Sequence, residues 1–194
     1  MVNNLIFNPG RRAVHRNLLP AAWAGKPRQA GRLSLVGNLL RHGPDTEPRT
    51  AFFTLHGAGD LHLHLHDNQA SDRAGRPVPM VDDQSAGQAR WLALARAELP
   101  AGLRIRPAAR LADELPHAVG ARPWDRDTLD ARLLGDMAAG RGQIIDSELQ
   151  NPLGYPAPAE CTRRPFAPED WNLDDMSPKS GGASLFNPLP GKVR

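Results

Sequence analysis

The sequence has a single cysteine, Cys161, among its 194 residues. One thiol cannot form a disulfide within the chain, nor a zinc site made of several cysteines. Aromatic residues account for only 5% of the chain, whereas there are 19 prolines and 18 glycines. We therefore expect a thin core of aliphatic side chains, with long irregular stretches between the ordered parts.

Lysine is also scarce, since it occurs only at Lys26, Lys179 and Lys192, and nearly all the positive charge is arginine. The formal net charge of +3 is compatible with nucleic acid, acidic lipid or an acidic polysaccharide as partner. The arginines are scattered, with no basic helix and no stripe interleaved with aromatics. No nucleic-acid partner is therefore expected, although a basic helical binder using residues 86–142 stays open as an alternative.

The chain has no apolar run long enough to cross a bilayer, so no membrane partner is expected. No basic-then-apolar leader is visible at Met1-Val2-Asn3-Asn4-Leu5, and the sequence opens directly in strand-like residues. If this strand begins a stack of strands, its outer edge has no partner. Because an unpaired edge is a template for another chain, we expect self-association through it.

Three strand-like runs, each ended by turn-forming residues, occur in the first third of the chain: 2–8, 32–40 and 60–68. Leu33 and Leu35 alternate with polar residues, which indicates that one face of the strand is buried. Leu61, Leu63 and Leu65 alternate in the same way. The runs are therefore predicted to be half-buried strands.

An asparagine recurs near the same place in each run, at Asn4, Asn38 and Asn68, with separations of 34 and 30 residues. A repeated strand-and-asparagine pattern at this spacing is typical of a coiled repeat architecture. Stacked asparagine side chains in successive coils can hydrogen-bond to one another as a ladder. We interpret these three residues as structural ladder residues rather than catalytic amides.

The pattern changes after residue 84, where helices are predicted over Gln88–Leu99, Pro107–Val119 and Asp127–Ala139, the last with Asp127 as N-cap. The predicted fold is mainly β. It consists of right-handed parallel β-helix coils over residues 1–84 and a helical segment over 85–150 that packs on or caps them. Residues 151–194, rich in proline, glycine and acidic side chains, are expected to be a mostly irregular tail.

Two blocks of the sequence are similar to the pectate lyase family. Asn3-Asn4-Leu5-Ile6-Phe7-Asn8-Pro9-Gly10 resembles the family strand Asn-Asn-Val-Ile-Tyr-Asn-Trp-Gly. The stretch from Leu33 to Pro44 resembles a later coil of the form Val-Asn-Leu-Val-Asn-Asn-Tyr-Tyr-Lys-Pro-Gly-Pro. A helical signature follows at Gly120-Ala121, Arg126-Asp127, Asp130, Arg132, Gly142 and Ile144-Ile145-Asp146-Ser147, with a partial match at Leu153-Gly154-Tyr155-Pro156. The resemblance extends over residues 2–156.

The resemblance implies a right-handed parallel β-helix that cleaves polygalacturonate by calcium-assisted β-elimination, in a secreted or periplasmic protein. In that family the calcium carboxylates and the catalytic arginine precede the Asn-Asn strand. No residue of this chain matches them, so no catalytic residue, metal ligand or cofactor is assigned here, although an intact family member is expected to use calcium. A non-catalytic remnant, or a carbohydrate-binding or interaction module, is the alternative.

Arginines in the loops after the first strand, Arg11, Arg12 and Arg28, are candidate contacts for an acidic polysaccharide, because guanidinium groups match the geometry of carboxylates. His62, His64 and His66 alternate along one strand, with His56 nearby. They suggest either a metal site or, more simply, a solvated outer face. Arg126, Asp127, Asp130 and Arg132 are interpreted as a helix cap with ion pairs rather than as a catalytic cluster.

Overall fold

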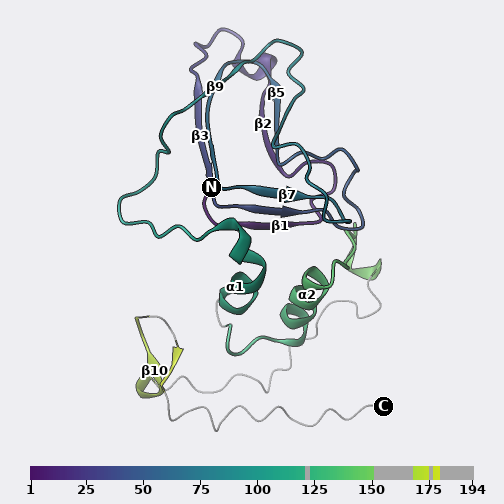
Figure 1. Ribbon diagram of the computed structural model, residues 1–194, viewed down its shortest axis with the longest axis vertical. Coiled ribbons are helices and arrows are strands. Elements are labelled where there is room, and N and C mark those ends of the chain that lie inside the picture. The colour runs from purple at the N-terminus through teal and green to yellow at the C-terminus, as the bar shows by residue number, and fades with distance from the viewer. Residues whose placement is uncertain (121–122, 151–167, 175–176, 180–194) are drawn as a thin grey trace.

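The computed structural model describes residues 1–120, 123–150, 168–174 and 177–179 of the chain. The protein is mainly β, with parallel strands stacked in three sheets and two short helices. In Figure 1 two of the sheets stand upright beside each other, the third crosses below them, and both helices lie beneath that third sheet.

Nine strands form the three sheets, and the chain visits the sheets in strict rotation. The first sheet contains β1 (Leu5–Phe7), β4 (Leu39–Arg41) and β7 (Gln69–Ser71). The second contains β2 (Val14–Leu18), β5 (Phe53–Gly57) and β8 (Val81–Asp83), and the third contains β3 (Gly31–Val36), β6 (Leu61–His66) and β9 (Trp91–Ala93). We call each set of three consecutive strands a coil.

All neighbouring strands within the three sheets are parallel, and each pair is in register. The predicted run over 32–40 is two strands, β3 and β4, which belong to different sheets and are separated by Gly37-Asn38. The run over 60–68 is likewise β6 followed directly by the corner that leads to β7. The strands of the second sheet were not predicted from the sequence.

The hydrophobic core lies between the three sheets and is aliphatic except for two phenylalanines. Leu35, Leu40, Phe53 and Leu55 are all fully buried in it, and they come from all three sheets. In β6 the buried Leu61 and Leu63 alternate with partly exposed histidines, as the pleat requires, whereas Phe53, Thr54 and Leu55 of the central strand β5 are all buried. The core was predicted to consist of leucine, valine, isoleucine and alanine; Phe52 and Phe53 were not predicted to belong to it.

The three asparagines at the corner between the third and first sheets form a continuous hydrogen-bonded ladder. Asn4 Nδ2 donates to Asn38 Oδ1 at 2.9 Å, and Asn38 Nδ2 donates to Asn68 Oδ1 at 2.8 Å. The backbone N–H groups of Asn4 and Asn38 donate to the same two oxygens. Asn38 has no exposed surface, so these bonds satisfy an amide that water cannot reach.

The residue before each ladder asparagine has a positive φ: 53° at Asn3, 61° at Gly37 and 47° at Asp67. These residues turn the chain from one sheet to the next, in the left-handed region that Gly, Asn and Asp tolerate best. Two of these residues also hydrogen-bond to the segment that joins β9 to the helix α1 (Leu111–Ala118). Asn3 exchanges hydrogen bonds with the backbone of Arg106 at 2.7 and 2.8 Å, and Asp67 accepts from the backbone N–H of Ala108 at 2.9 Å.

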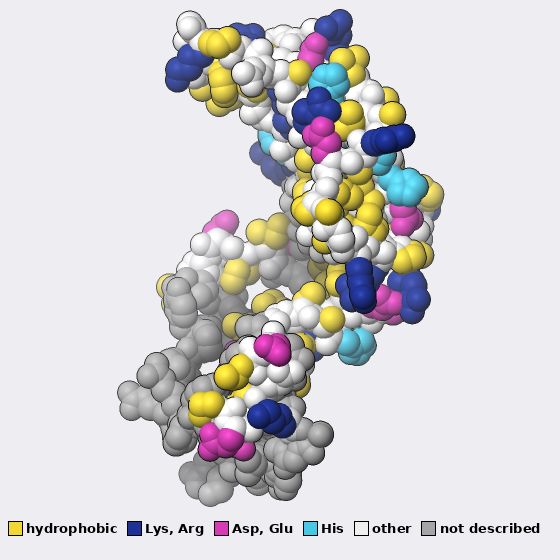
Figure 2. Space-filling model, turned by 90° about the vertical axis from the view of Figure 1, so that its left-hand side faces the viewer, with side chains coloured by type: hydrophobic (Ala, Val, Ile, Leu, Met, Phe, Trp, Pro, Cys, Tyr) yellow, Lys and Arg dark blue, Asp and Glu magenta, His cyan; other side chains and the backbone are white. Residues whose placement is uncertain are grey.

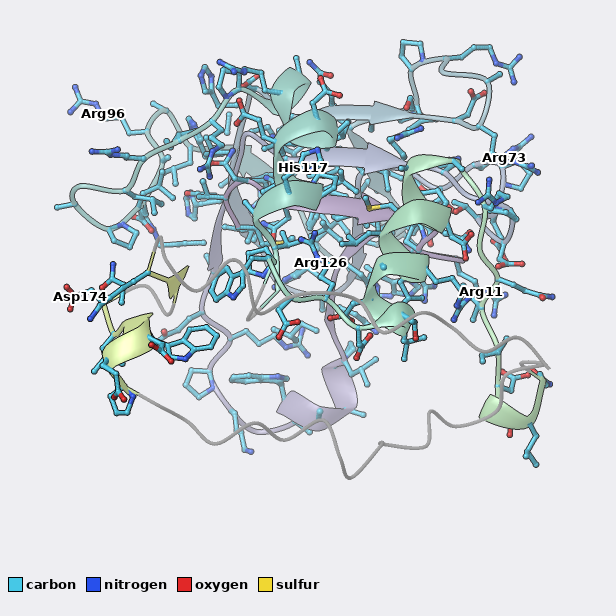
Figure 3. The ribbon with its side chains drawn as sticks, turned by 90° about the horizontal axis from the view of Figure 1, so that it is seen from below. Arg11, Arg73, Arg96, His117, Arg126 and Asp174 are labelled. Carbon is cyan, nitrogen blue, oxygen red and sulfur yellow. The ribbon has the colours of Figure 1, made fainter. Side chains whose placement is uncertain are left out.

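The helices α1 (Leu111–Ala118) and α2 (Thr128–Ala138) lie beside the outward face of the first sheet (Figures 1 and 3). Leu111 is fully buried. Asp127 is the N-cap of α2, because its side chain accepts from the backbone N–H of Asp130 at 2.8 Å. The helices predicted over 107–119 and 127–139 are therefore present.

The helix predicted over Gln88–Leu99 is wrong. Residues Trp91–Ala93 form β9, which pairs with β6 so that Trp91 faces Leu61. The high helix propensity of this alanine- and leucine-rich stretch is overridden by pairing with the open edge of β6. The stack of coils consequently continues beyond residue 84.

Part of the predicted irregular tail is a short antiparallel hairpin of β10 (Trp171–Asn172) and β11 (Ser177–Pro178). The rings of Trp171 and Trp124 lie 6.3 Å apart. The rest of the tail, including Cys161 and the partial match at 153–156, lies outside the described residues.

Candidate functional site

A shallow groove of about 700 Å³ lies where the second sheet meets the loops that follow β4 and β7. Thr54 of β5 and Asp82 of β8 contribute its sheet side, and they are register partners on adjacent strands. Because Phe53 and Leu55 are buried in the core, Thr54 between them belongs to the opposite, outward row of the sheet. The sheet therefore provides a fixed floor and the loops provide the walls.

The groove is lined by charges of both signs. Its cations are Arg11, Arg49 and Arg76, and its acidic residues are Glu47, Asp72 and Asp82. Arg11 Nε pairs with Glu47 at 3.0 Å, and Arg76 Nε pairs with Asp72 at 2.7 Å. The pKa of Asp72 lies below its ordinary value because the backbone N–H of Arg76 donates to its carboxylate, and the Arg76 side chain acts in the same direction.

Arg49 differs from the other two arginines because it forms no ion pair with a described residue. Its guanidinium is exposed to solvent at the rim of the groove. An unpaired guanidinium offers a bidentate donor to a carboxylate of a ligand. Arg49 is therefore the cation of the groove that is most available to an anion.

Only one of the three arginines predicted to contact a polysaccharide lies at the groove. Arg11 lines it, whereas Arg12 is exposed outside it and Arg28 lies in the loop before β3. In Figure 3, Arg11 and Arg73 lie on the same side of the molecule and Arg96 on the opposite side. Arg73 belongs to the same loop as Arg76, yet it does not line the groove.

His15 and His56 project from neighbouring strands of the second sheet, with ring centroids 6.1 Å apart in an edge-to-face arrangement. Partial removal from water lowers the pKa of His15, and the nearby charges of Arg12 and His56 lower it further. His15 faces Thr54 across the strand pair, so the histidine pair adjoins the groove without lining it. The sequence indicated His56 only as a neighbour of His62, His64 and His66, and it did not connect His56 with His15, which is 41 residues away along the chain.

His62, His64 and His66 lie in the outward row of β6, beside the arginine, serine and valine of β3. His64 Nδ1 is 2.8 Å from the carbonyl oxygen of Leu94, and the ring of His66 is tilted against that of His64 at 6.2 Å. Among the described residues, no group of three or more His, Cys, Asp or Glu side chains is arranged to hold a metal ion.

The charged residues at the start of α2 have local partners. Arg126 donates to the backbone carbonyl of Val119 at 2.9 Å, and Arg132 pairs with Asp136. In α1 and the turn before it, Glu114 pairs with both Arg106 and Arg110. Arg106, Arg110 and Arg132 thus each have a carboxylate partner within this segment.

The sequence indicated the ladder corner but not the groove. The groove is formed by Arg49, Arg76 and the second sheet. Their sequence shows no repeated pattern as clear as that of the ladder asparagines. The only signal in the sequence was the alternation of Phe53 and Leu55 with polar residues, followed by Val81 before two aspartates.

No family model matches this chain, and neither a curated protein nor a solved structure matches it. Within the described residues, no helix is both long enough and apolar enough to span a membrane.

Proposed function

We propose that this chain is a right-handed parallel β-helix of the pectate lyase type and that it binds an acidic polysaccharide, such as polygalacturonate, in the groove of the second sheet. One observation supports this reading above the others. The two blocks that resemble the family, around Asn4 and Asn38, lie on successive coils, with Leu5 opposite Leu39 and Ile6 opposite Leu40. They are therefore equivalent turns of one repeat, as expected for two coils of one β-helix.

The chemistry of the groove is compatible with a uronate polymer. Such a polymer carries a carboxylate on every sugar ring, so it presents a row of anions to the arginines at the rim. Arg49 has no ion-pair partner among the described residues, and Arg11 and Arg76 can exchange their protein carboxylates for those of a ligand. Asp82 and Gln84 supply carboxylate and amide groups for sugar hydroxyls, while Thr54, which is 3% exposed, forms part of the floor beneath them.

Polymer binding and polymer cleavage require different residues. In the pectate lyase reaction a base removes the C5 proton of a uronate whose carboxylate is neutralised by calcium, and the C4–O4 bond then breaks to leave a C4=C5 double bond. The sequence blocks that resemble the family include neither the calcium carboxylates nor the catalytic arginine. This chain is therefore proposed to bind the polymer. It would take part in lyase catalysis only if the calcium carboxylates and the catalytic arginine came from outside the blocks that resemble the family.

The binding test compares polygalacturonate with a neutral galactan, by affinity electrophoresis or calorimetry at low and moderate salt. We expect retention by polygalacturonate alone, weakened by salt because the contacts are ionic. Arg49→Gln should weaken binding about two- to fivefold, the usual contribution of one exposed ion pair, and Arg49→Gln with Arg76→Gln about tenfold. Arg73→Gln, a change in the same loop but outside the groove, should leave binding unchanged.

Equal binding of the two polymers, or equal loss with Arg73→Gln, would refute the groove as the site.

A separate activity test follows the absorbance of unsaturated products from polygalacturonate with and without calcium. We expect no calcium-dependent rise. A clear rate that a chelator abolishes would mean that the chain holds calcium ligands and a base that the resemblance does not identify.

A further inference from the structure

The loop between β2 and β3, residues 19–30, is exposed along its whole length. It contains the 3₁₀ helix η1 (Pro20–Trp23) and begins with an apolar run in which Leu19 is 57% exposed and Trp23 is 41% exposed. It lies at the upper end of the molecule in Figure 1, and Figure 2 shows hydrophobic and basic side chains at that end, with some acidic ones among them. A large aromatic and a leucine exposed together in this way require an explanation.

Three backbone N–H groups in the apolar first half of the loop donate to carbonyls of the same segment. Ala22 donates to Leu19, Ala24 to Ala21 and Lys26 to Trp23, all within 3.3 Å, and Pro20 has no N–H to satisfy. Each of these internal bonds lowers the cost of moving the turn around η1 out of water, because an unpaired N–H group is costly in an apolar medium. A Cβ built on Gly25 would meet no atom within 4 Å, so the tip stands clear of the rest of the protein.

The stretch of chain that carries this tip has charge of one sign, and Asp60 in the adjacent corner of the next coil is paired with Arg90. Residues 1–44 contain no Asp or Glu, and their cations are Arg11, Arg12, Arg16, Lys26, Arg28, Arg32 and Arg41. Lys26 and Arg28 follow the apolar run directly, and neither forms an ion pair with a described residue. The loop thus combines an apolar tip with two uncompensated cations at its base.

We propose that the loop over residues 19–30 docks on an anionic lipid surface. Leu19 and Trp23 enter the boundary between headgroups and acyl chains, where tryptophan is favoured, and Lys26 with Arg28 contacts the lipid phosphates. A polysaccharide would use the exposed tryptophan and the cations, but it gives no role to Leu19 and the alanines beside it. Lipid uses the entire loop. The contact is reversible, because one short apolar tip is a weak anchor by itself.

The experiment uses the full chain and vesicles of phosphatidylcholine, with or without phosphatidylglycerol, in a cosedimentation assay. We expect binding to the anionic vesicles only. Lys26→Ser with Arg28→Ser should weaken it at least about tenfold, since each basic residue near an anionic surface contributes on the order of a fivefold change. Leu19→Ser with Trp23→Ser should also weaken it strongly, and Arg96→Ser, an exposed arginine on a distant loop, should not.

Lipids brominated in their acyl chains provide a second readout, because they quench a tryptophan only when it enters the membrane. Quenching should disappear in Trp23→Phe, although three other tryptophans remain in the chain. The proposal fails if all arginine changes weaken binding equally, or if the apolar pair of changes has no effect. It also fails if the loop variants lose affinity for polygalacturonate but not for vesicles, since the loop would then be a saccharide contact. If only Arg49→Gln weakens polygalacturonate binding, that result concerns the groove and does not affect the lipid proposal.

Discussion

The central rung of the asparagine ladder gives the most direct test of how the coils are held together. Replacing Asn38 with leucine keeps a side chain of similar size but removes the amide. The change eliminates the acceptor for the backbone N–H and the Nδ2 of Asn4, at 3.0 and 2.9 Å, and the donor to Asn68 Oδ1 at 2.8 Å. Asn68 Oδ1 keeps the backbone N–H of residue 38 as a partner.

The expected cost follows from these partners. The three short hydrogen bonds, at a net value of about 1 kcal/mol each, give about 3 kcal/mol. A fourth bond, from Asn38 Nδ2 to the carbonyl oxygen of Met1, is 3.4 Å long and adds little. Asn4 and Asn68 are only half-buried, so water can replace part of what is lost, and the leucine side chain gains some apolar burial. We expect Asn38→Leu to lower the free energy of unfolding by about 1–3 kcal/mol. For a chain of this size, that corresponds to a fall in Tm of about 4–8 °C at the middle of the range.

Thermal and urea unfolding, followed by circular dichroism, measures the effect. Asn17→Leu is the matched control, because Asn17 is exposed on β2 and belongs to no ladder. We expect the control to change Tm by less than about 2 °C, as surface substitutions usually do. An unchanged Tm for Asn38→Leu would refute the view that the amide ladder stabilises this corner.

Three further predictions concern the same fold. Gly37→Ala should lower stability by at least about 1 kcal/mol more than Gly75→Ala: both positions have a positive φ, but a Cβ on Gly37 would be 2.8 Å from the Arg106 carbonyl, whereas Gly75 has open space. Leu111→Ala should cost about 2–4 kcal/mol in urea unfolding, against almost nothing for Leu149→Ala, which changes a side chain that is 84% exposed. Hydrogen bonds from Arg90 and Arg32 lower the pKa values of Asp60 and Glu98. Their stabilisation is therefore complete above the ordinary carboxylate pKa of about 4 and is lost as the pH falls through the lower folded values. Asp60→Asn with Glu98→Gln should make the stability less dependent on pH in that acid range, and an acid limb equal to that of the wild type would contradict the assignment.

Much of the coil architecture could be predicted from the sequence because one corner carries a strict chemical requirement. A buried amide must find partners, and residues that turn the chain with a positive φ are restricted in type, so the ladder corner leaves a repeated pattern at Asn4, Asn38 and Asn68. The second sheet has no such requirement. Its strands mix His, Arg and Asn with a few apolar residues. The alternating stretches in β2 and β8 were too short to be recognised in the sequence.

The helix predicted over 88–99 failed for a related reason. Alanine, leucine and arginine favour a helix in isolation, but Trp91–Ala93 follows a coil whose edge is already formed and pairs with it. The candidate groove could not be predicted in full, because Arg49 and Arg76 come from loops of successive coils. Their proximity results from the stacking of β5 on β8, which short-range patterns do not report.

The ladder corner also determines where this protein can change in length. The chain passes from the third sheet to the first through Gly37-Asn38 in one coil and Asp67-Asn68 in the next, without variation. The other corners differ widely: residues 8–13, 42–52 and 72–80 join the first sheet to the second, and 19–30, 58–60 and 84–90 join the second to the third. The ladder asparagines are therefore 34 and 30 residues apart, yet the strands remain aligned. Segments grafted into the variable corners should alter what the surface recognises without shifting the strand register, whereas one residue inserted beside Asn38 would misalign every following strand.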